Sequence, residues 1–274
     1  MTAEATAETA AARPRVPVWR TVVTAYRDTF ANFGAFLKIA ALPLLLGIGV
    51  AVVLPESETD PASHLLNIAL ATLLAVIFEL SWYRFLLFGG AQSEVRLLPP
   101  WNARFRRFLG FSFLLLLPTA PAELFLLVLG SREGEALATL YALAVLMYVT
   151  GIYFGLRLTF ALLWIAGDAP GRLAESWRST RGNGLRLLLI FILVVLPPFL
   201  LLFALGIVIA IVNPEVAAQF EAGDYEGWLY WVDVITTQVL LFVFYAIVCA
   251  ALTRSFASLT GWIGDRAELL ERFE

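Results

Sequence analysis

The sequence has one cysteine, one histidine and few charges, and each shortage excludes a class of site. Cys249 has no partner for an intrachain disulfide, and His64 alone is too little for a histidine- and cysteine-based metal centre. The net charge is -3 and no basic block stands beside aromatic residues, which argues against nucleic acid as a partner. We therefore expect neither a metal nor a cofactor.

Catalytic motifs are also missing. The sequence contains no GxSxG, no P-loop, no HExxH and no GxGxxG, and Ser176 has no histidine near it. Residues 1–16 lack the apolar run of a cleaved signal peptide, and their alanine- and glutamate-rich composition predicts a disordered tail. These features predict a protein without catalytic activity.

Apolar residues, in contrast, are abundant. Of the 274 residues 60% are hydrophobic and only 15% are charged, and the mean hydropathy is +0.82. This composition is too apolar for a soluble domain and predicts an all-α, polytopic membrane protein. We expect one membrane domain, residues 17–264, followed by a tail at 265–274. Its six predicted transmembrane helices cover residues 36–54, 65–90, 108–129, 137–166, 185–212 and 228–256.

The arginines indicate how the chain is oriented. Four precede the first span, four lie between the second and third, four lie around the fourth-to-fifth junction, and two lie in the C-terminal tail. The opposite loops, around 55–64, 130–136 and 213–227, hold only Arg132. By the positive-inside rule both termini are cytoplasmic. Eighteen arginines against one lysine is typical of a GC-rich bacterial genome, so we expect a multi-pass protein of the bacterial inner membrane.

Three hairpins repeat one plan. Each odd span carries a Leu-Pro pair, each even span carries one arginine near its inner end, and each odd span follows a segment with proline and tryptophan. The prolines of the pairs are Pro43, Pro118 and Pro197, the arginines are Arg84, Arg157 and Arg254, and the tryptophans are Trp19, Trp101 and Trp177. The pattern predicts a threefold internal repeat with amphipathic helices at the cytoplasmic interface.

The run from Arg157 onward resembles a known bacterial group. Arg157, Asp168, the pair Ser176-Trp177, Thr180 and the pair Gly182-Asn183 precede a new apolar run. This run is similar to the YciC-like inner-membrane proteins and to the membrane domain attached to some glycerophosphodiester phosphodiesterases. The proline expected after the arginine is replaced by Leu162-Leu163-Trp164. The resemblance implies an uncharacterised membrane protein, and it implies no phosphodiesterase activity because the soluble catalytic domain is missing.

The arginines near the inner ends of the even spans are candidate lipid ligands. Arg84 and Arg157 lie about 20 residues past the starts of their spans, or about 30 Å along the helix, and Arg254 is similar. An arginine at that depth either snorkels to the interface or grips a lipid phosphate. With Arg178, Arg181 and Trp177 on the adjoining segment, we predict an anionic phospholipid site, with Arg157 as its main contact.

Glu79 is the most deeply placed charge. It lies 14 residues into its span, about 21 Å from the start, and Tyr83 follows at i+4. Glu79 either packs helices as a hydrogen-bonded carboxyl or serves as a proton or cation site. Glu123, next to a proline-kinked stretch, is a second buried polar candidate. In the fourth span, Gly151 and Gly155 form a GxxxG that favours close packing within the chain.

Three functions remain open at this point. The first is a non-catalytic membrane protein that binds anionic phospholipid or organises membrane protein partners. The second is a small transporter or channel that uses Glu79, and the third is a lipid-modifying enzyme. A polar path that joins Glu79, Glu123 and the outer side would favour transport, whereas a dry interior would favour a binding or organising role.

Overall fold

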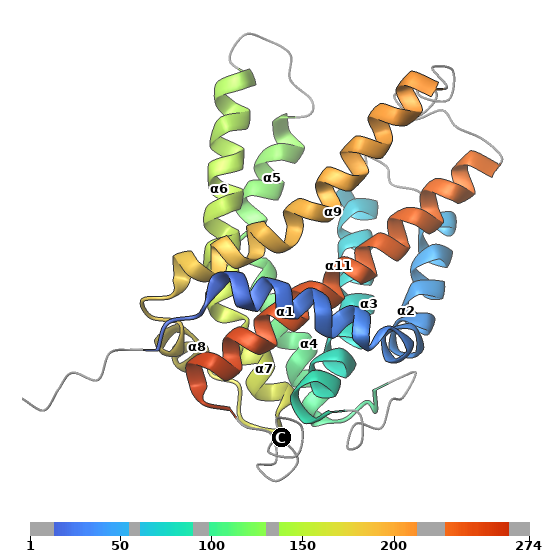
Figure 1. Ribbon diagram of the computed structural model, residues 1–274. Coiled ribbons are helices and arrows are strands. Elements are labelled where there is room, and N and C mark those ends of the chain that lie inside the picture. Colours follow the sequence, from blue (N-terminus) through green and yellow to red (C-terminus); the bar gives the residue numbers. More distant parts are fainter. Residues whose placement is uncertain (1–13, 55–60, 90–98, 130–136, 213–227, 263–274) are drawn as a thin grey trace, which may run out of the picture.

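The computed structural model describes residues 14–54, 61–89, 99–129, 137–212 and 228–262. Among these residues every regular element is a helix, which confirms the predicted all-α class. The helices are α1 (Val18–Ala31), α2 (Phe33–Val53), α3 (Pro61–Phe88), α4 (Ala103–Leu116), α5 (Ala120–Leu129), α6 (Leu137–Leu158), α7 (Phe160–Ala166), α8 (Leu173–Ser179), α9 (Gly184–Val212) and α11 (Trp228–Thr260) (Figure 1). The predicted tail 265–274 lies outside the described residues.

Five helical stretches are long and apolar enough to cross a membrane. They are Phe33–Val53, Leu65–Phe88, Ala138–Ala166, Gly184–Val208 and Leu229–Thr260. Five of the six predicted spans therefore correspond to helices within a few residues of the predicted bounds. The apolar surface of α6 and α9 suits hydrocarbon surroundings, since many of the described Leu, Val, Ile and Phe side chains on these helices are exposed.

The predicted span 108–129 is not a single helix. The chain leaves the helical conformation at residues 117–119, between α4 and α5, where Pro118 has no N–H to donate. α5 packs along α6, and Gly151 faces the Pro118 carbonyl so closely that any side chain there would clash. Gly155 has open space instead. Only the first glycine of the pair therefore makes the predicted close contact within the chain.

α1 lies across α9 and α11 (Figure 1). Its Val22, Ala25 and Thr29 are buried, while Trp19 on another face is 71% exposed. The Tyr26 hydroxyl donates to the Val194 carbonyl oxygen at 2.7 Å, and burial raises the pKa of this hydroxyl, so the donor stays protonated. α1 is therefore fixed by packing and by a polar contact rather than lying loose.

The predicted disordered tail 1–16 is corrected for its last residues. Val16 is fully buried and its N–H donates to Asn183 Oδ1 at 3.1 Å. Asn183 Nδ2 donates to the Pro14 carbonyl at 3.1 Å, and an Arg186 terminal nitrogen donates to the Val16 carbonyl at 3.0 Å. The start of α9 therefore holds residues 14–16. The rest of that tail lies outside the described residues.

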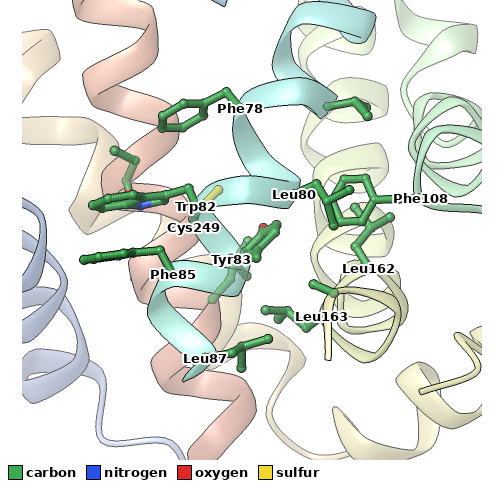
Figure 2. Packing of buried hydrophobic residues seen from close by; sticks show 14 of the residues in the cluster. Phe78, Leu80, Trp82, Tyr83, Phe85, Leu87, Phe108, Leu162, Leu163 and Cys249 are labelled. Carbon is green, nitrogen blue, oxygen red and sulfur yellow. The ribbon is translucent and has the colours of Figure 1, made fainter. Parts of the chain in front are cut away.

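The main core is centred on α3 (Figure 2). Phe78, Trp82 and Phe85 stack along one side of this helix, and Tyr83 on another side points toward Phe108 of α4. Trp82 is fully buried, and its ring N–H donates to the Ala246 carbonyl of α11 at 3.0 Å. Large aromatic side chains thus close the space between α2, α3 and α11 at this level.

Candidate functional site

Arg157, near the end of α6, is held by the α8 segment. Its Nε donates to Thr180 Oγ1 at 3.2 Å, and a terminal nitrogen donates to the Trp177 carbonyl at 2.9 Å. In return, the Ser176 hydroxyl donates to the Arg157 carbonyl at 2.6 Å. The residue is 7% exposed. We call these four residues the Arg157 network, and it binds the end of α6 to α8 through both backbone and side chains.

Aromatic rings complete the Arg157 network. The guanidinium carbon lies 3.3 Å from the centre of the Trp177 ring and 5.8 Å from that of Tyr153. Trp177 also stacks on Phe154, with ring centres 5.7 Å apart. One face of the guanidinium is therefore covered by indole, a favourable arrangement for a cation out of water. Four of the residues on which the family resemblance is based, Arg157, Ser176, Trp177 and Thr180, thus meet in one contact.

Arg84, near the end of α3, meets Asp168. One of its terminal nitrogens donates to the Ala166 carbonyl at 2.8 Å and to Asp168 Oδ2 at 2.9 Å. Arg104 of α4 forms an ion pair with the other carboxylate oxygen of Asp168. Asp168 has a φ of 65°, a left-handed conformation that Asp tolerates better than most residues do. Asp168 thereby links α3 to α4.

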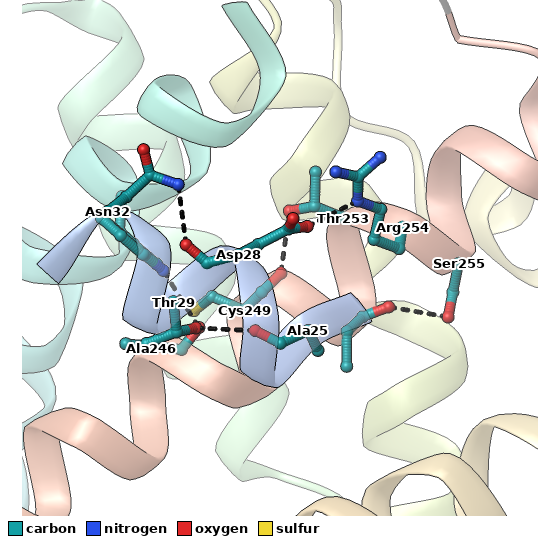
Figure 3. Close-up of polar contacts among 11 residues, drawn as sticks. Ala25, Asp28, Thr29, Asn32, Ala246, Cys249, Thr253, Arg254 and Ser255 are labelled. Atoms are coloured by element: carbon teal, nitrogen blue, oxygen red, sulfur yellow. Dashed lines mark hydrogen bonds and ion pairs between the residues drawn. The ribbon is translucent and has the colours of Figure 1, made fainter. Parts of the chain in front are cut away.

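Arg254, in the last turns of α11, pairs with α1 (Figure 3). Its Nε donates to Asp28 Oδ2 at 2.7 Å. The arginine side chain is 46% exposed, whereas the carboxylate side chain is 14% exposed. Asn32, at the C-terminal end of α1, donates its side-chain amide to the Asp28 carbonyl at 2.7 Å. The contact between Arg254 and Asp28 is therefore more exposed to solvent than the Arg157 network.

The three arginine contacts follow the same order along the sequence. Each arginine of an even span reaches the segment that leads into the next odd span: Arg84 reaches α4 through Asp168, Arg157 reaches α8, and Arg254 returns to α1. We call the end of the molecule at which they lie the arginine end, and the other the far end. Sequence reasoning found the three arginines but missed the carboxylates Asp28 and Asp168 that receive two of them.

The remaining predicted lipid ligands lie on the surface. Arg178 and Arg181 are exposed, and Arg178 Nε makes one contact with the Ala174 carbonyl at 3.3 Å. Trp177 is about one-third exposed while it covers Arg157. The predicted set is therefore divided: Arg157 is enclosed by protein, Arg84 and Arg254 are paired with carboxylates, and the two α8-end arginines face outward.

Glu79 lies among tyrosines of two helices. It is close enough to Tyr83 of its own helix and to Tyr245 of α11 to interact electrostatically with each. Tyr83 is hydrogen-bonded to the thiol of Cys249, one turn along α11 from Tyr245. Glu79 and Tyr83 thus share a face of α3, as their i,i+4 spacing predicted.

Glu123 is connected to the same cluster through a tyrosine. Its carboxylate accepts a hydrogen bond from the Tyr148 hydroxyl of α6, and Tyr148 is within electrostatic range of Tyr245. Glu123, Tyr148, Tyr245 and Glu79 therefore form a series of polar groups from α5 to α3. We call it the polar series. The sequence contained both glutamates, but not the tyrosines that join them.

A cavity of about 460 Å³ lies between α2, α3 and α11 at the far end. Tyr245, a member of the polar series, lies in its wall together with Phe242. Other polar side chains of this wall come from α3 and from successive turns of α11; they are Asn67, Tyr230, Asp233, Thr237 and Gln238. We call this space the far cavity. Asp233 was not among the candidate site residues predicted from the sequence.

A second cavity of about 460 Å³ lies at the arginine end, between α1, α3 and α11. Asp28, Asn32, Thr253 and Arg254 contribute its polar wall, and Phe85 lies in its apolar wall. We call this space the near cavity. Sequence reasoning did not predict a cavity at either end, because neither the helix pairing nor the tilt can be read from composition.

The two cavities are separated by aromatic side chains. Phe242, in the wall of the far cavity, contacts Phe78 with ring centres 5.4 Å apart. Trp82 stacks between Phe78 and Phe85, at 6.2 and 5.2 Å, and Phe85 lines the near cavity. Phe36 of α2 packs edge-on against Phe78 and Trp82. We call these five rings the aromatic layer; Figure 2 shows three of them, Phe78, Trp82 and Phe85.

The described residues contain no group of three or more His, Cys, Asp or Glu side chains that could hold a metal ion. No protein-family model, curated protein or solved structure matches the chain. The function must therefore be argued from the site itself.

Proposed function

We propose that the protein carries a small polar solute across a bacterial inner membrane, through the group formed by α2, α3 and α11. The single observation behind this proposal is the pair of cavities at opposite ends of α3 and α11, the far one completed by α2 and the near one by α1, with the aromatic layer between them. A site that is open to one side at a time needs such an arrangement. The arginine bias orients the near cavity toward the cytoplasm, with both termini on that side.

In this proposal Glu79 is the ionisable group that couples to the solute. A carboxyl within a span is costly unless it is used or paired, and Glu79 is within electrostatic range of Tyr245, which lies in the wall of the far cavity. Each tyrosine hydroxyl of the polar series can both donate and accept a hydrogen bond. Glu123 is the second carboxyl of the series.

The proposed topology completes six crossings as three repeated hairpins. α4 and α5 together form the third crossing, bent at Pro118, with α5 beside α6 and α4 beside α7. α1 and α8 are the proposed interfacial helices of the first and third hairpins, and the start of α4 takes that place in the second. The cyclic pattern of the three arginine contacts supports this repeat.

Cysteine labelling tests the two cavities. In a C249A background, Thr237→Cys places a thiol in the far cavity and Thr253→Cys places one in the near cavity. A permanently charged, membrane-impermeant thiosulfonate should label the first only from the periplasmic side and the second only from the cytoplasmic side. Thr236→Cys, an exposed neighbour on α11 outside the cavity wall, is the matched control and should react slowly from both sides.

A flux assay tests transport itself. Protein in liposomes that contain a pH-sensitive dye is given a panel of small solutes, and the wild type should show solute-dependent proton movement. Glu79→Gln should reduce this flux at least about tenfold, as removal of a general acid–base group does. Lys38→Gln, which changes an exposed charge of α2, should leave it unchanged. An E79Q flux equal to the wild-type flux would refute the role of Glu79.

A second candidate function is recognition of anionic phospholipid at the arginine end. Exposed arginines accompany exposed tryptophans there: Trp19 is 71% and Trp101 is 66% exposed. Because Arg157 is enclosed by protein, this candidate moves the main lipid contact to Arg178 and Arg181. Each such arginine contributes about 1 kcal/mol of attraction to an anionic surface. Such a surface also suits a membrane protein partner.

Native mass spectrometry separates lipid recognition from ordinary surface charge. The double variant R178Q/R181Q should retain less phosphatidylglycerol and cardiolipin than the wild type. The double variant R20Q/R27Q, which removes two exposed charges from α1, is the matched control and should keep the bound lipid. Equal losses in both variants would show that the arginines attract lipid only as part of a general positive surface.

A further inference from the structure

α2 stands at the edge of the helix group, beside α3 and α11 (Figure 1). Pro43 divides this helix into an inner part and an outer part, and we call residues 44–54 the outer arm. Because proline has no N–H, position 43 cannot donate the usual helical hydrogen bond to the Ile39 carbonyl. Gly47 and Gly49 follow in the next turns, and glycine also weakens a helix. The start of the outer arm is therefore where α2 bends most readily.

The two parts of α2 differ in how they are packed. In the inner part, Phe36, Ile39 and Ala40 are 1–3% exposed and belong to the main core. In the outer arm only Gly47 is buried, and Val53 near its end is 75% exposed. A segment with few buried side chains moves at a lower cost than one that is part of a core. The inner part is thus anchored, whereas the outer arm is held more weakly.

The outer arm forms one wall of the far cavity. The described residues that α2 contributes to this wall all follow Pro43; they are Gly47, Val50, Ala51 and Leu54. On the opposite side of the arm, Leu45 is 66% exposed, as suits contact with hydrocarbon. The arm therefore has a cavity on one side and an exposed apolar surface on the other, so that a bend away from α11 breaks few side-chain contacts.

The outer arm contacts α11 at two depths. The Tyr230 hydroxyl donates to the Ala51 carbonyl at 3.4 Å, which is long for a hydrogen bond between two oxygens. Deeper in the molecule the Gln238 amide lies against Gly47, and its Oε1 is 2.7 Å from where a β-carbon would stand. The first contact is weak, and the second depends on the absence of a side chain from position 47.

We propose that the outer arm is the gate of the far cavity, which swings away from α11 on a hinge at Pro43 and is held closed by the bond from Tyr230 to Ala51. Hinges of this kind are a few residues that absorb the change in backbone angles. The proposal rests on the proposed transport function in that it names the part of the chain that admits the solute to this cavity.

The other walls of the far cavity stay in place in this proposal. α3 and α11 line both cavities, and the Trp82 ring N–H joins these two helices by donating to the Ala246 carbonyl at 3.0 Å. Phe36, in the inner part of α2, packs on Trp82 in the aromatic layer. Because the hinge lies beyond Phe36, the layer remains closed while the outer arm moves. The far cavity thus opens without opening the near one.

Distances between spin labels, measured by double electron–electron resonance in liposomes, test the hinge. In a C249A background, Val53→Cys with Val239→Cys is the outer pair, and Leu37→Cys with Val239→Cys is the inner pair; all three labelled positions are exposed. The distance distribution of the outer pair should be about twice as wide as that of the inner pair, or wider. Pro43→Ala, which restores the missing N–H, should narrow the outer distribution and leave the inner one unchanged.

Two results of the spin-label experiment would overturn the proposal. The first is an outer distribution as narrow as the inner one. The second is a wide outer distribution that P43A does not narrow, because fraying of the helix end would then account for the width.

A matched pair of glycine variants tests the gate. Gly47→Val should push the outer arm away from the Gln238 amide, whereas a side chain at Gly49, two residues on, meets open space. The reporter is Thr237→Cys in the cavity wall, again in the C249A background. G47V should speed labelling of this thiol by the charged thiosulfonate about fivefold or more, because an overpacked contact favours the open arm. G49V should leave the labelling rate unchanged.

Tyr230→Phe tests the latch without any steric change. It keeps the ring but loses the donor to the Ala51 carbonyl, so labelling in the same background should become up to about fivefold faster. This variant also decides the case where G47V does not fold. Acceleration in G47V alone would keep the gate and refute the latch. Labelling rates that neither variant changes would overturn the gate.

The liposome flux assay separates the gate from transport. Hinge motion and faster labelling, without solute-dependent flux in the wild type, would leave the gate standing and refute transport. Solute-dependent flux in a protein whose outer pair is as narrow as its inner pair would refute the gate and leave transport standing.

Discussion

Replacing Arg157 by glutamine should destabilise the protein far more than the same change at Arg254. Arg157 is 7% exposed, donates to Thr180 and to the Trp177 carbonyl, and stacks on the indole at 3.3 Å. Hydrogen bonds to a charged group contribute about 1.5–3 kcal/mol each, and a desolvated cation–π contact contributes about 2 kcal/mol. Since glutamine retains part of the polarity, we expect a loss of about 3–5 kcal/mol, the range for breaking a buried ionic contact.

Arg254 provides the comparison. It ends an even span as Arg157 does, but it is 46% exposed and makes one ion pair with Asp28. Exposed pairs contribute about 0–1 kcal/mol. In a protein of this size 1 kcal/mol corresponds to a melting-temperature shift of about 2–4 °C. We therefore expect R157Q to melt about 6–20 °C below the wild type and R254Q less than about 4 °C below it.

Thermal unfolding in one detergent, followed by tryptophan fluorescence and by size-exclusion recovery, measures both variants. Arg157→Lys is the informative third variant, because it keeps the charge but loses the planar group that stacks on Trp177. Its melting temperature should fall between those of R157Q and the wild type. Equal shifts for R157Q and R254Q would refute the argument, since burial would then make no difference to the cost.

The remaining predictions concern the supports of the fold. Gly151→Val should lower stability by at least about 1–3 kcal/mol, because its side chain meets the Pro118 carbonyl, whereas Gly155→Val should cost less; melting curves of both variants check this. Tyr26→Phe should lower stability by about 1 kcal/mol through loss of the bond to Val194, measured in the same way. Asp168→Asn should tolerate the positive φ but lose both ion pairs, so limited proteolysis should cleave the segment between α7 and α8 faster than in the wild type. Asp168→Glu keeps the charge but should also be cleaved faster, because the longer side chain fits the turn less well.

The hydropathy of the chain is enough to predict most of its helices, because about 20 apolar residues in a row have few alternatives. It is not enough to predict the break at Pro118. Pro43 and Pro197 stand in the same Leu-Pro pairs, yet α2 and α9 continue through them. At Pro118 the chain lies against Gly151, more than 30 residues away in sequence, whose lack of a side chain leaves room for the Pro118 carbonyl. A local pattern does not contain that information.

The candidate site likewise contains residues that the sequence predicts and residues that it does not. The arginines and Glu79 could be found because a charge in an apolar run is conspicuous. Their partners could not, because Asp28 and Asp168 lie in ordinary polar segments, and Tyr148 and Tyr245 look like any aromatic residue of a span. The near cavity joins residues 28 and 254, whose proximity depends on how α1 lies across α11. The prediction that Arg157 contacts lipid assumed that its side chain lies on the surface. Arg157 is buried in the structure, so this assumption does not hold.

The contact between Asp28 and Arg254 has a consequence for biogenesis. A ribosome releases α1 before α9 and α11, so α1 has neither Arg254 nor the surfaces of these two helices to pack on until they have been made. Until then its buried face, with Val22 and Ala25, is available to lipid or to a chaperone. A chain that stops before α11 therefore leaves α1 without its docking surface. Docking of α1 thus requires that α9 and α11 have been made and have inserted.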